Sequence, residues 1–381
     1  MIQERKKMFY LIPSLFDYVL YGVFFIVGFR LAELGTNAVT ASAPMAVWGI
    51  VYALSAPLVG RLTTSENALK LLRISGIGTA VCALLFMFFQ DVWGMLILVG
   101  VMGIVSAFYC IPFQMCANAG NEGRTPERAA GLYTFAWSIG TAAGTFGFGS
   151  LPGNAGFAVN AVIGILMIFF AGMGRSGTKE KAPETALPEQ PNAPDRMVPV
   201  WIFGTVGAFA MAVASALLPL RGAELKNGLF LTGAALAVLR LVQGLAALGL
   251  IWGCKRLSAV QLLFLALLTG TGGMVCLGFS SVIGLLFAGT FLFGLCGGIF
   301  YFSLVYYALG NVQKGARYLG VNEMILGITG IAGPFAGGAA VQELGIDTVF
   351  IICAGVLFLG GAAAAGIVCF QNKKFSQDKA C

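Results

Sequence analysis

Apolar runs long enough to cross a membrane, about 18 residues or more, follow one another along almost the whole chain. Short segments with charged residues, glycine, proline or asparagine separate them. Runs of this length suit helices, because barrel strands would be alternating segments of about 10 residues. The pattern predicts an all-α integral membrane protein with twelve transmembrane helices, near residues 8–31, 37–60, 69–89, 92–117, 128–152, 154–174, 197–220, 227–253, 257–279, 281–309, 318–341 and 345–370.

One break between the runs is much longer than the others. Residues 175–196 contain four prolines and charges of both signs, a composition typical of a disordered linker. The linker divides the chain into an N-terminal six-helix half, residues 1–174, and a C-terminal six-helix half, residues 197–381, which ends in a short tail. We expect the linker and the tail to be cytoplasmic.

The two predicted halves contain matching residues at a nearly constant offset. FRLAEL at residues 29–34 corresponds to LRGAEL at residues 220–225, an offset of 191. A second set has an offset of 189 and pairs Arg128, Gly131, Gly144 and Gly149 with Arg317, Gly320, Gly333 and Gly338. Two sets that agree so closely on corresponding helices indicate a duplication. With six helices in each half, the repeats are predicted to be parallel, related by an axis along the membrane normal.

The amino-acid composition is typical of an integral membrane protein. Hydrophobic residues make up 58% and charged residues only 10%, against about 25% charged in soluble domains. The net charge of +7 does not indicate nucleic-acid binding, because the basic residues lie in short clusters between apolar runs. With both termini inside, 19 of the 23 basic residues fall on the cytoplasmic side. We therefore predict a multi-pass protein of the cytoplasmic (inner) membrane.

Several chemistries are excluded by residues that the sequence lacks. Without histidine, it has no imidazole metal ligand and no Ser-His or Cys-His nucleophile pair. The nine cysteines are scattered without metal-site spacing, and no Walker A motif is present. We expect no metal, no cofactor, no catalytic residues and no ATP hydrolysis.

The two parallel six-helix repeats and several motifs resemble the major facilitator superfamily of secondary transporters. GITGIAGPFAGG at residues 327–338 is similar to its glycine-rich helix motif, and GTAAGTFGFG at residues 140–149 is the first-half counterpart without proline. GRLT at residues 60–63 resembles the start of its cytoplasmic loop motif, although Thr64 replaces the aspartate and the basic residues are displaced to Lys70 and Arg73. The resemblance implies alternating access, with gating or helix packing by Gly60, Gly140, Gly144, Gly330, Gly333 and Pro334.

Small residues on the fifth and eleventh helices permit close helix approach in a membrane. The resemblance places these two helices where the halves meet. We expect their glycines, at positions 140, 144 and 147 and at positions 327, 330 and 333, to let the halves rock and not to contact substrate.

Asp17 lies about nine residues into the first helix, roughly 13 Å along its axis. Tyr10, Ser14 and Tyr21 share its face at spacings of three and four. A carboxylate at a helix centre costs about 2.5 to 3.5 kcal/mol on insertion scales, so it faces a cavity or a partner. It is either a proton-coupling carboxyl or a structural hydrogen-bonding group.

Arg240 lies near the middle of the eighth helix and cannot lose its charge by deprotonation. It either binds an anionic group of the substrate or forms a structural ion pair. Glu323 is the first candidate for such a pair, and Asp17 is the second. Gln243, one turn further, shares the face of Arg240.

Neutral polar and aromatic residues complete the candidate substrate or coupling site. Gln114 and Asn118 form a polar patch on the fourth helix, suited to substrate hydroxyls or to hydrogen bonds between helices. The aromatic candidates are pocket lining or ordinary packing residues: Tyr133, Trp137, Tyr301, Tyr306 and Tyr307.

The sequence thus predicts a secondary active transporter of a small solute. We expect it to be proton-coupled and to work as a monomer, exporting metabolites or drugs or carrying an organic anion or a sugar. The alternatives are a sensor or scaffold on a transporter fold and, less favoured, a lipid-modifying membrane enzyme.

Overall fold

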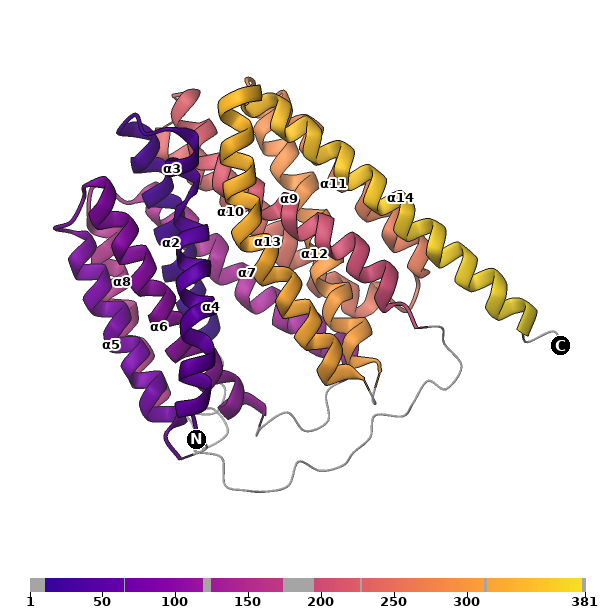
Figure 1. Ribbon diagram of the computed structural model, residues 1–381, viewed down its shortest axis with the longest axis horizontal. Helices are drawn as coiled ribbons and strands as arrows, with labels where there is room; N and C mark the ends of the chain where they lie inside the picture. Colours follow the sequence, from indigo (N-terminus) through magenta and orange to yellow (C-terminus); the bar gives the residue numbers. More distant parts are fainter. Residues whose placement is uncertain are drawn as a thin grey trace. The chain divides into compact units, whose positions relative to one another are not determined.

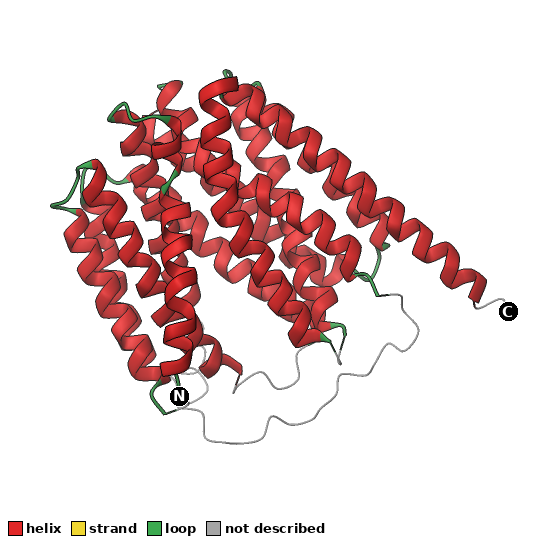
Figure 2. Ribbon diagram, in the orientation of Figure 1, coloured by secondary structure: helices red, strands yellow, loops and turns green. Residues whose placement is uncertain are grey.

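The computed structural model describes residues 11–64, 66–118, 125–173, 195–226, 228–311 and 314–378. These residues form helices and connecting loops, and none of them lies in a strand (Figure 2). Twelve helices have 17 to 33 residues, and a thirteenth has only five (Figure 1). The predicted all-α fold and its twelve long helices are therefore confirmed.

The helices follow the predicted apolar runs closely. Those of the first half are α2 (Ile12–Glu33), α3 (Ala38–Ser42), α4 (Pro44–Leu62), α5 (Ala68–Phe86), α6 (Val92–Asn118), α7 (Pro126–Ser150) and α8 (Ala155–Ala171). Those of the second half are α9 (Met197–Glu224), α10 (Gly228–Gly253), α11 (Ala259–Gly278), α12 (Ile283–Leu309), α13 (Gly315–Leu344) and α14 (Ile346–Asp378).

The second predicted run, residues 37–60, consists of two helices instead of one. Asn37 caps the short α3, because its side chain accepts a hydrogen bond of 2.9 Å from the backbone nitrogen of Thr40. Pro44 then occupies the first position of α4, where its missing N–H needs no partner. Local capping chemistry thus divides a run that is continuous in hydropathy.

Ten of the described helices are long and apolar enough to cross a membrane. Helix α8 is apolar but has 17 residues, and α7 is rich in glycine, threonine and serine, which lowers its hydropathy. Large apolar side chains are exposed along the helices, as lipid contact requires. Among the most exposed are Leu54, Trp93, Ile97, Phe264, Leu359 and Phe370.

The helices form two compact units. The first contains the described residues of 1–123, 139–184 and 215–237, and the second those of 124–138, 185–214 and 238–381. The boundaries of the units fall inside α7, α9 and α10. Most of the predicted linker lies outside the described residues, and the division of the chain at residues 175–196 stays a prediction.

Equivalent glycines pack on equivalent helices in the two units. In the first unit, a Cβ atom on Gly144 of α7 would collide with the carbonyl oxygen of Tyr18 on α2. In the second unit, a Cβ atom on Gly333 of α13 would lie 3.1 Å from the carbonyl oxygen of Phe209 on α9 and 2.7 Å from the Cβ of Ala212. Gly144 and Gly333 are 189 residues apart, and Tyr18 and Phe209, whose carbonyl oxygens they face, are 191 residues apart. These are the two offsets of the sequence repeat. The internal repeat is therefore a repeat of packing as well as of sequence.

We expect Gly144→Ala and Gly333→Ala each to destabilise the protein by about 1–3 kcal/mol, because the added methyl group forces closely packed helices apart. Gly327→Ala is the matched control, since a Cβ atom at this position of α13 would meet nothing within 4 Å. Thermal or denaturant unfolding in detergent measures the difference. Equal stability of all three variants would contradict the packing.

Helices α7 and α10 contact each other inside each unit. In the first unit, a Cβ atom on Gly233 would lie 2.7 Å from the carbonyl oxygen of Thr145, and Phe146 packs edge-on against Phe230. In the second unit, a Cβ atom on Gly244 would lie 2.9 Å from the Cβ of Ser138. A helix of the first sequence half thus packs on a helix of the second.

Candidate functional site

A chain of buried polar side chains joins α10 to α7 in the second unit. Arg240 and Gln243 are one helical turn apart on α10, and Arg240 Nη1 donates a hydrogen bond of 3.0 Å to Gln243 Oε1. Gln243 Nε2 in turn donates a hydrogen bond of 2.8 Å to Ser138 Oγ on α7. The three residues are 2%, 0% and 0% exposed, respectively. Gln243 therefore orients the guanidinium through an anchor on another helix.

Two aromatic rings lie beside this guanidinium. The Cζ atom of Arg240 is 6.0 Å from the ring centroid of Trp137, at the outer limit of a cation–π contact. Trp137 packs edge-on against Tyr301 of α12, with centroids 5.0 Å apart. The Tyr301 hydroxyl lies within hydrogen-bonding reach of Arg240, and Glu323 of α13 is close enough to interact electrostatically with Tyr301. Helices α7, α10, α12 and α13 thus all contribute to the surroundings of Arg240.

Glycines on α12 make room for Gln243. A Cβ atom on Gly297 would lie 3.0 Å from Gln243 Oε1, and one on Gly298 would lie 2.5 Å from the backbone oxygen of Gln243. A Cβ atom on Gly294 would likewise lie 2.5 Å from the backbone oxygen of Leu239. Only residues without a side chain permit this approach of α12 to α10. The fold holds the amide of Gln243 rigidly where it contacts Arg240.

Removing the Ser138 hydroxyl is expected to leave the Gln243 amide buried without this acceptor, so Ser138→Ala should lower stability by about 1 kcal/mol. Thr134→Val is the matched control. Thr134 lies one turn earlier on α7, is equally buried, and its hydroxyl has no hydrogen-bond partner among the residues that the structure describes. Unfolding in detergent compares the two, and an equal loss of stability would show that the Ser138 contact contributes nothing.

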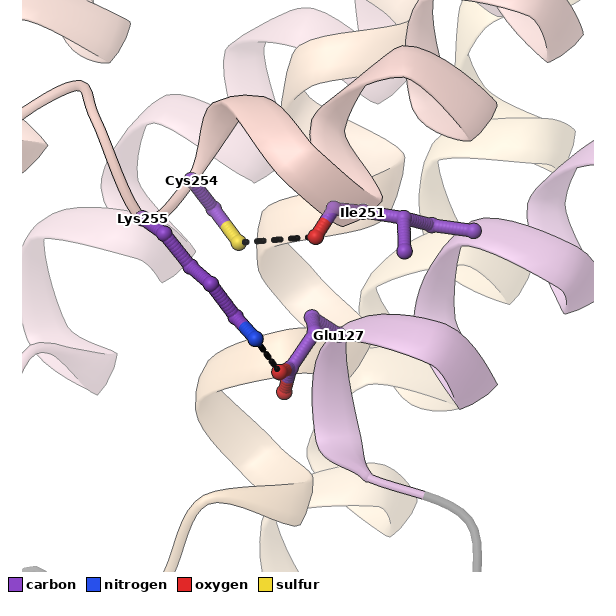
Figure 3. Close-up of polar contacts among 4 residues, drawn as sticks. All are labelled: Glu127, Ile251, Cys254 and Lys255. Carbon is purple, nitrogen blue, oxygen red and sulfur yellow. Dashed lines mark hydrogen bonds and ion pairs between the residues drawn. The ribbon is translucent and has the colours of Figure 1, made fainter.

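An ion pair connects α7 with the residues after α10, again in the second unit. Lys255 Nζ lies 3.1 Å from Glu127 Oε1 (Figure 3). The Lys255 side chain is 69% exposed, so the pair contributes at most about 1 kcal/mol. Cys254, next to Lys255, lies just beyond α10, and burial, followed by the negative charge of Glu127, raises the pKa of its thiol. This thiol is therefore protonated at neutral pH and is not an activated nucleophile.

The described residues contain no group of three or more Cys, Asp or Glu side chains placed to hold a metal ion. The site is instead a buried cation with a neutral hydrogen-bonding relay and aromatic neighbours. Such a constellation is chemically suited to hydrogen-bonding a polar solute, and the described side chains around it include no nucleophile with an adjacent general base.

The family model of the Major Facilitator Superfamily matches residues 8–308 of the chain. The chain belongs to the major facilitator superfamily. Its fold is that of this superfamily's transporters, as two solved structures show. The nucleoside transporter NupG has a TM-score of 0.70 and 14% identity, over 95% of this chain and 98% of that chain. The human organic anion transporter MFSD10 (TETRAN) has a TM-score of 0.69 and 13% identity, over 95% of this chain and 99% of that chain. No curated protein sequence matches the chain.

Membership of the major facilitator superfamily makes the chain a multi-pass membrane transporter and not an enzyme. The lipid-modifying enzyme considered from the sequence is thereby set aside. At these identities the two solved structures show the fold alone, so the substrate has to be argued from the chain's own residues.

Among the residues predicted from the sequence, Arg240, Gln243, Trp137 and Tyr301 come together in the superfamily fold. Glu323 is near Tyr301, and its ion pair with Arg240 stays a prediction. Tyr133 is 54% exposed on α7. Tyr306 packs face to face on Phe302 and edge-on against Tyr307 on α12.

Asp17 lies half-buried on α2 in the first unit, with Ser14 and Tyr21 on the same helix. Tyr21 packs edge-on against Phe24. Tyr10 lies outside the described residues. Gln114 and Asn118 belong to the last turns of α6, and their side chains are outside the described part of the structure.

The motif residues have packing or loop contacts. Gly140, like Gly144, faces α2, where a Cβ atom would collide with the carbonyl oxygen of Ser14. Gly330 and Pro334 lie within α13. Gly60 is exposed at the end of α4, and in the following loop the Asn67 side chain bonds the backbone of Thr64 and Leu62. The role of these residues in gating stays a prediction.

Ser138 is the residue of the network that sequence reasoning missed. It is one of several small hydroxyl residues on α7, and its own helix gives no sign of function. Its significance depends on the contact of α7 with α10, which no spacing in the sequence reveals.

Proposed function

We propose that the protein is a proton-coupled secondary transporter that carries an organic anion by alternating access, with Arg240 as the residue that binds the anionic group. The transporter family supports the general activity, and the substrate class and the coupling are inferred from the buried side chains.

The observation that supports this proposal most strongly is that hydrogen bonds fix the position of the buried Arg240 guanidinium. A guanidinium inside a membrane protein is costly and marks a substrate or ion pathway by default. In this protein Gln243 and Ser138 fix its position, and a planar donor that is fixed in advance suits bidentate recognition of a carboxylate or phosphate.

The aromatic pair Trp137 and Tyr301 favours an organic anion over an inorganic one. Both rings are half-buried beside the guanidinium, so they offer aromatic surface next to the positive charge. The fold neighbours include a protein named as a nucleoside transporter and one named as an organic anion transporter.

Proton coupling is assigned to the carboxyl groups of Asp17 and Glu323. A carboxyl group inside the membrane binds a proton more readily as it is desolvated and releases it when a cation approaches. Alternating exposure of such a group during the transport cycle couples proton movement to that of the substrate. We further propose that the monomer is the working unit.

The topology assigned to this function has both termini in the cytoplasm. In a variant without native cysteines, Thr185→Cys and Gly315→Cys are expected to react with an impermeant thiol reagent only from the cytoplasmic side, and Leu225→Cys only from outside. Labelling of positions 185 and 225 from the same side would contradict the model of two six-helix halves.

A thermal-shift screen of the purified protein tests the proposed substrate class. Organic anions and their neutral amide or ester analogues are compared at pH 6 and pH 8. The proposal expects stabilisation by particular anions and not by their neutral analogues, with a pH dependence that reflects the coupling carboxyl groups. Stabilisation by neutral solutes alone would contradict it.

A further inference from the structure

A narrow pocket opens in the second unit between the start of α9 and the later part of α14, with walls from α11 and α12. Its lining is largely apolar and includes Val200, Phe203, Leu262 and Ile299, with Arg196 and Tyr307 as polar members. Neither Arg240 nor Gln243 contributes to it. The pocket is therefore distinct from the proposed substrate site.

Arg196 brings a positive charge to this apolar pocket. Its guanidinium donates hydrogen bonds of 3.3 Å to the backbone oxygen of Val368 and to Gln371 Oε1, and a further bond to Asn372 Oδ1. All three acceptors on α14 are neutral. Burial lowers the pKa of this guanidinium, as expected for a cation partly withdrawn from water.

The neighbouring Asp195 has other partners. Its carboxylate accepts hydrogen bonds from the Tyr318 hydroxyl of α13 and, at 3.0 Å, from the backbone nitrogen of Met197. The Tyr307 hydroxyl is near enough to Arg196 to interact with it electrostatically. Among the described residues, the hydrogen-bond acceptors of the Arg196 guanidinium at the edge of this apolar pocket are thus all uncharged.

This end of the second unit is rich in positive charge. Exposed basic residues lie in the loop before α11 and in the last turns of α14, namely Lys255, Arg256, Lys373 and Lys374. Basic clusters at the end of membrane helices attract anionic lipid headgroups. The surrounding charge favours a phospholipid from the adjacent leaflet over a neutral amphiphile.

We infer that this pocket binds an anionic phospholipid, with the phosphate against Arg196 and the beginning of one acyl chain among Val200, Phe203 and Leu262. The phosphate supplies an anionic acceptor, which the described partners of the guanidinium do not, and the acyl chain fills the apolar lining. Because Arg196 already links α9 to α14, the bound lipid is expected to stabilise the contact of these helices.

The test measures binding of phosphatidylglycerol to the delipidated full-length protein, by native mass spectrometry and by thermal shift in detergent. We expect Arg196→Gln to weaken the binding at least about tenfold, since a charge-assisted hydrogen-bond pair is lost. Arg61→Gln is the matched control, because it removes an equal charge from an exposed residue of α4 that lies outside this basic cluster. It should leave binding within about twofold of the native value.

A second variant keeps the charge and fills the pocket. Ala259 lines the pocket, and Ala259→Phe should reduce lipid binding even if Arg196→Gln does not fold. Phosphatidylcholine, oleate and inorganic phosphate are the comparison ligands. The inference would be overturned if phosphatidylcholine bound as tightly as phosphatidylglycerol, or if oleate bound and phosphatidylglycerol did not. It would also be overturned if inorganic phosphate alone had the same effect as the lipid, or if both variants bound phosphatidylglycerol like the native protein.

Discussion

Replacing Arg240 by lysine is expected to weaken binding of an anionic substrate by about tenfold to a hundredfold, while the protein stays folded in detergent. Lysine keeps the positive charge but loses the planar fork that binds a carboxylate at two points. It also cannot keep both the contact with Gln243 and a bidentate contact with the substrate. The affinity is measured by titration calorimetry or by thermal shift against the anion found in the screen.

Arg221→Lys is the matched control for this prediction. Arg221 is also buried in a transmembrane helix, at 7% exposure, but it lies at the end of α9 beside Glu224, 3.6 Å away. Its replacement should leave substrate affinity unchanged. If both lysine variants bind the anion like the native protein, Arg240 does not contact substrate.

The structural alternative for Arg240 predicts a different result. If Arg240 forms an ion pair with a buried carboxylate, Arg240→Ala strands that carboxylate and costs about 3–5 kcal/mol of stability. If Glu323 is the partner, adding Glu323→Gln should relieve much of this loss of stability, and adding Asp17→Asn should not. If Asp17 is the partner, the opposite result is expected. Double-mutant cycles of both pairs identify it. Coupling in stability with unchanged substrate affinity would assign Arg240 to structure.

The second large effect is expected for Asp17. Asp17→Asn keeps the size of the side chain but removes its ability to carry a proton, so transport driven by a pH gradient should fall to the level of protein-free liposomes. Substrate binding and exchange of substrate for substrate should largely persist, because neither requires net proton movement. Glu33→Gln, at the exposed end of the same helix, is the control.

Asp17 would be a structural residue if the Asp17→Asn variant still accumulated or expelled substrate at the native rate under an imposed gradient. The same assay with Glu323→Gln then decides whether the second carboxyl group couples transport. Native behaviour of both variants would remove proton coupling from the proposed mechanism.

Most of the fold was predictable because hydrocarbon imposes strict requirements on a sequence. Each helix has to supply a long apolar run and satisfy its own backbone, so the twelve helices follow the hydropathy pattern. The exception, α3, depends on Asn37 and Pro44, whose effect is local and leaves average hydropathy unchanged. The duplication was visible because Gly144 and Gly333 are fixed by equivalent backbone contacts.

The site was predictable only in part. Arg240 is conspicuous because a permanent charge in an apolar run has few explanations, and Gln243 follows from its spacing of three residues. Ser138 and the pairing of Trp137 with Tyr301 depend on which helices contact each other. Helices with apolar residues on every side give little orientation signal, so sequence periodicity does not specify these partners.

Transport in proteoliposomes tests the central claim most directly. Purified protein is reconstituted in liposomes that are preloaded with the anion identified by thermal shift, and counterflow of labelled anion is measured for the native protein and for Arg240→Gln. The account predicts exchange well above protein-free liposomes for the native protein and its loss in Arg240→Gln, with Arg221→Lys still active. A native protein that binds the anion without moving it, or an Arg240→Gln variant that exchanges it at the native rate, would contradict an anion transporter built around Arg240.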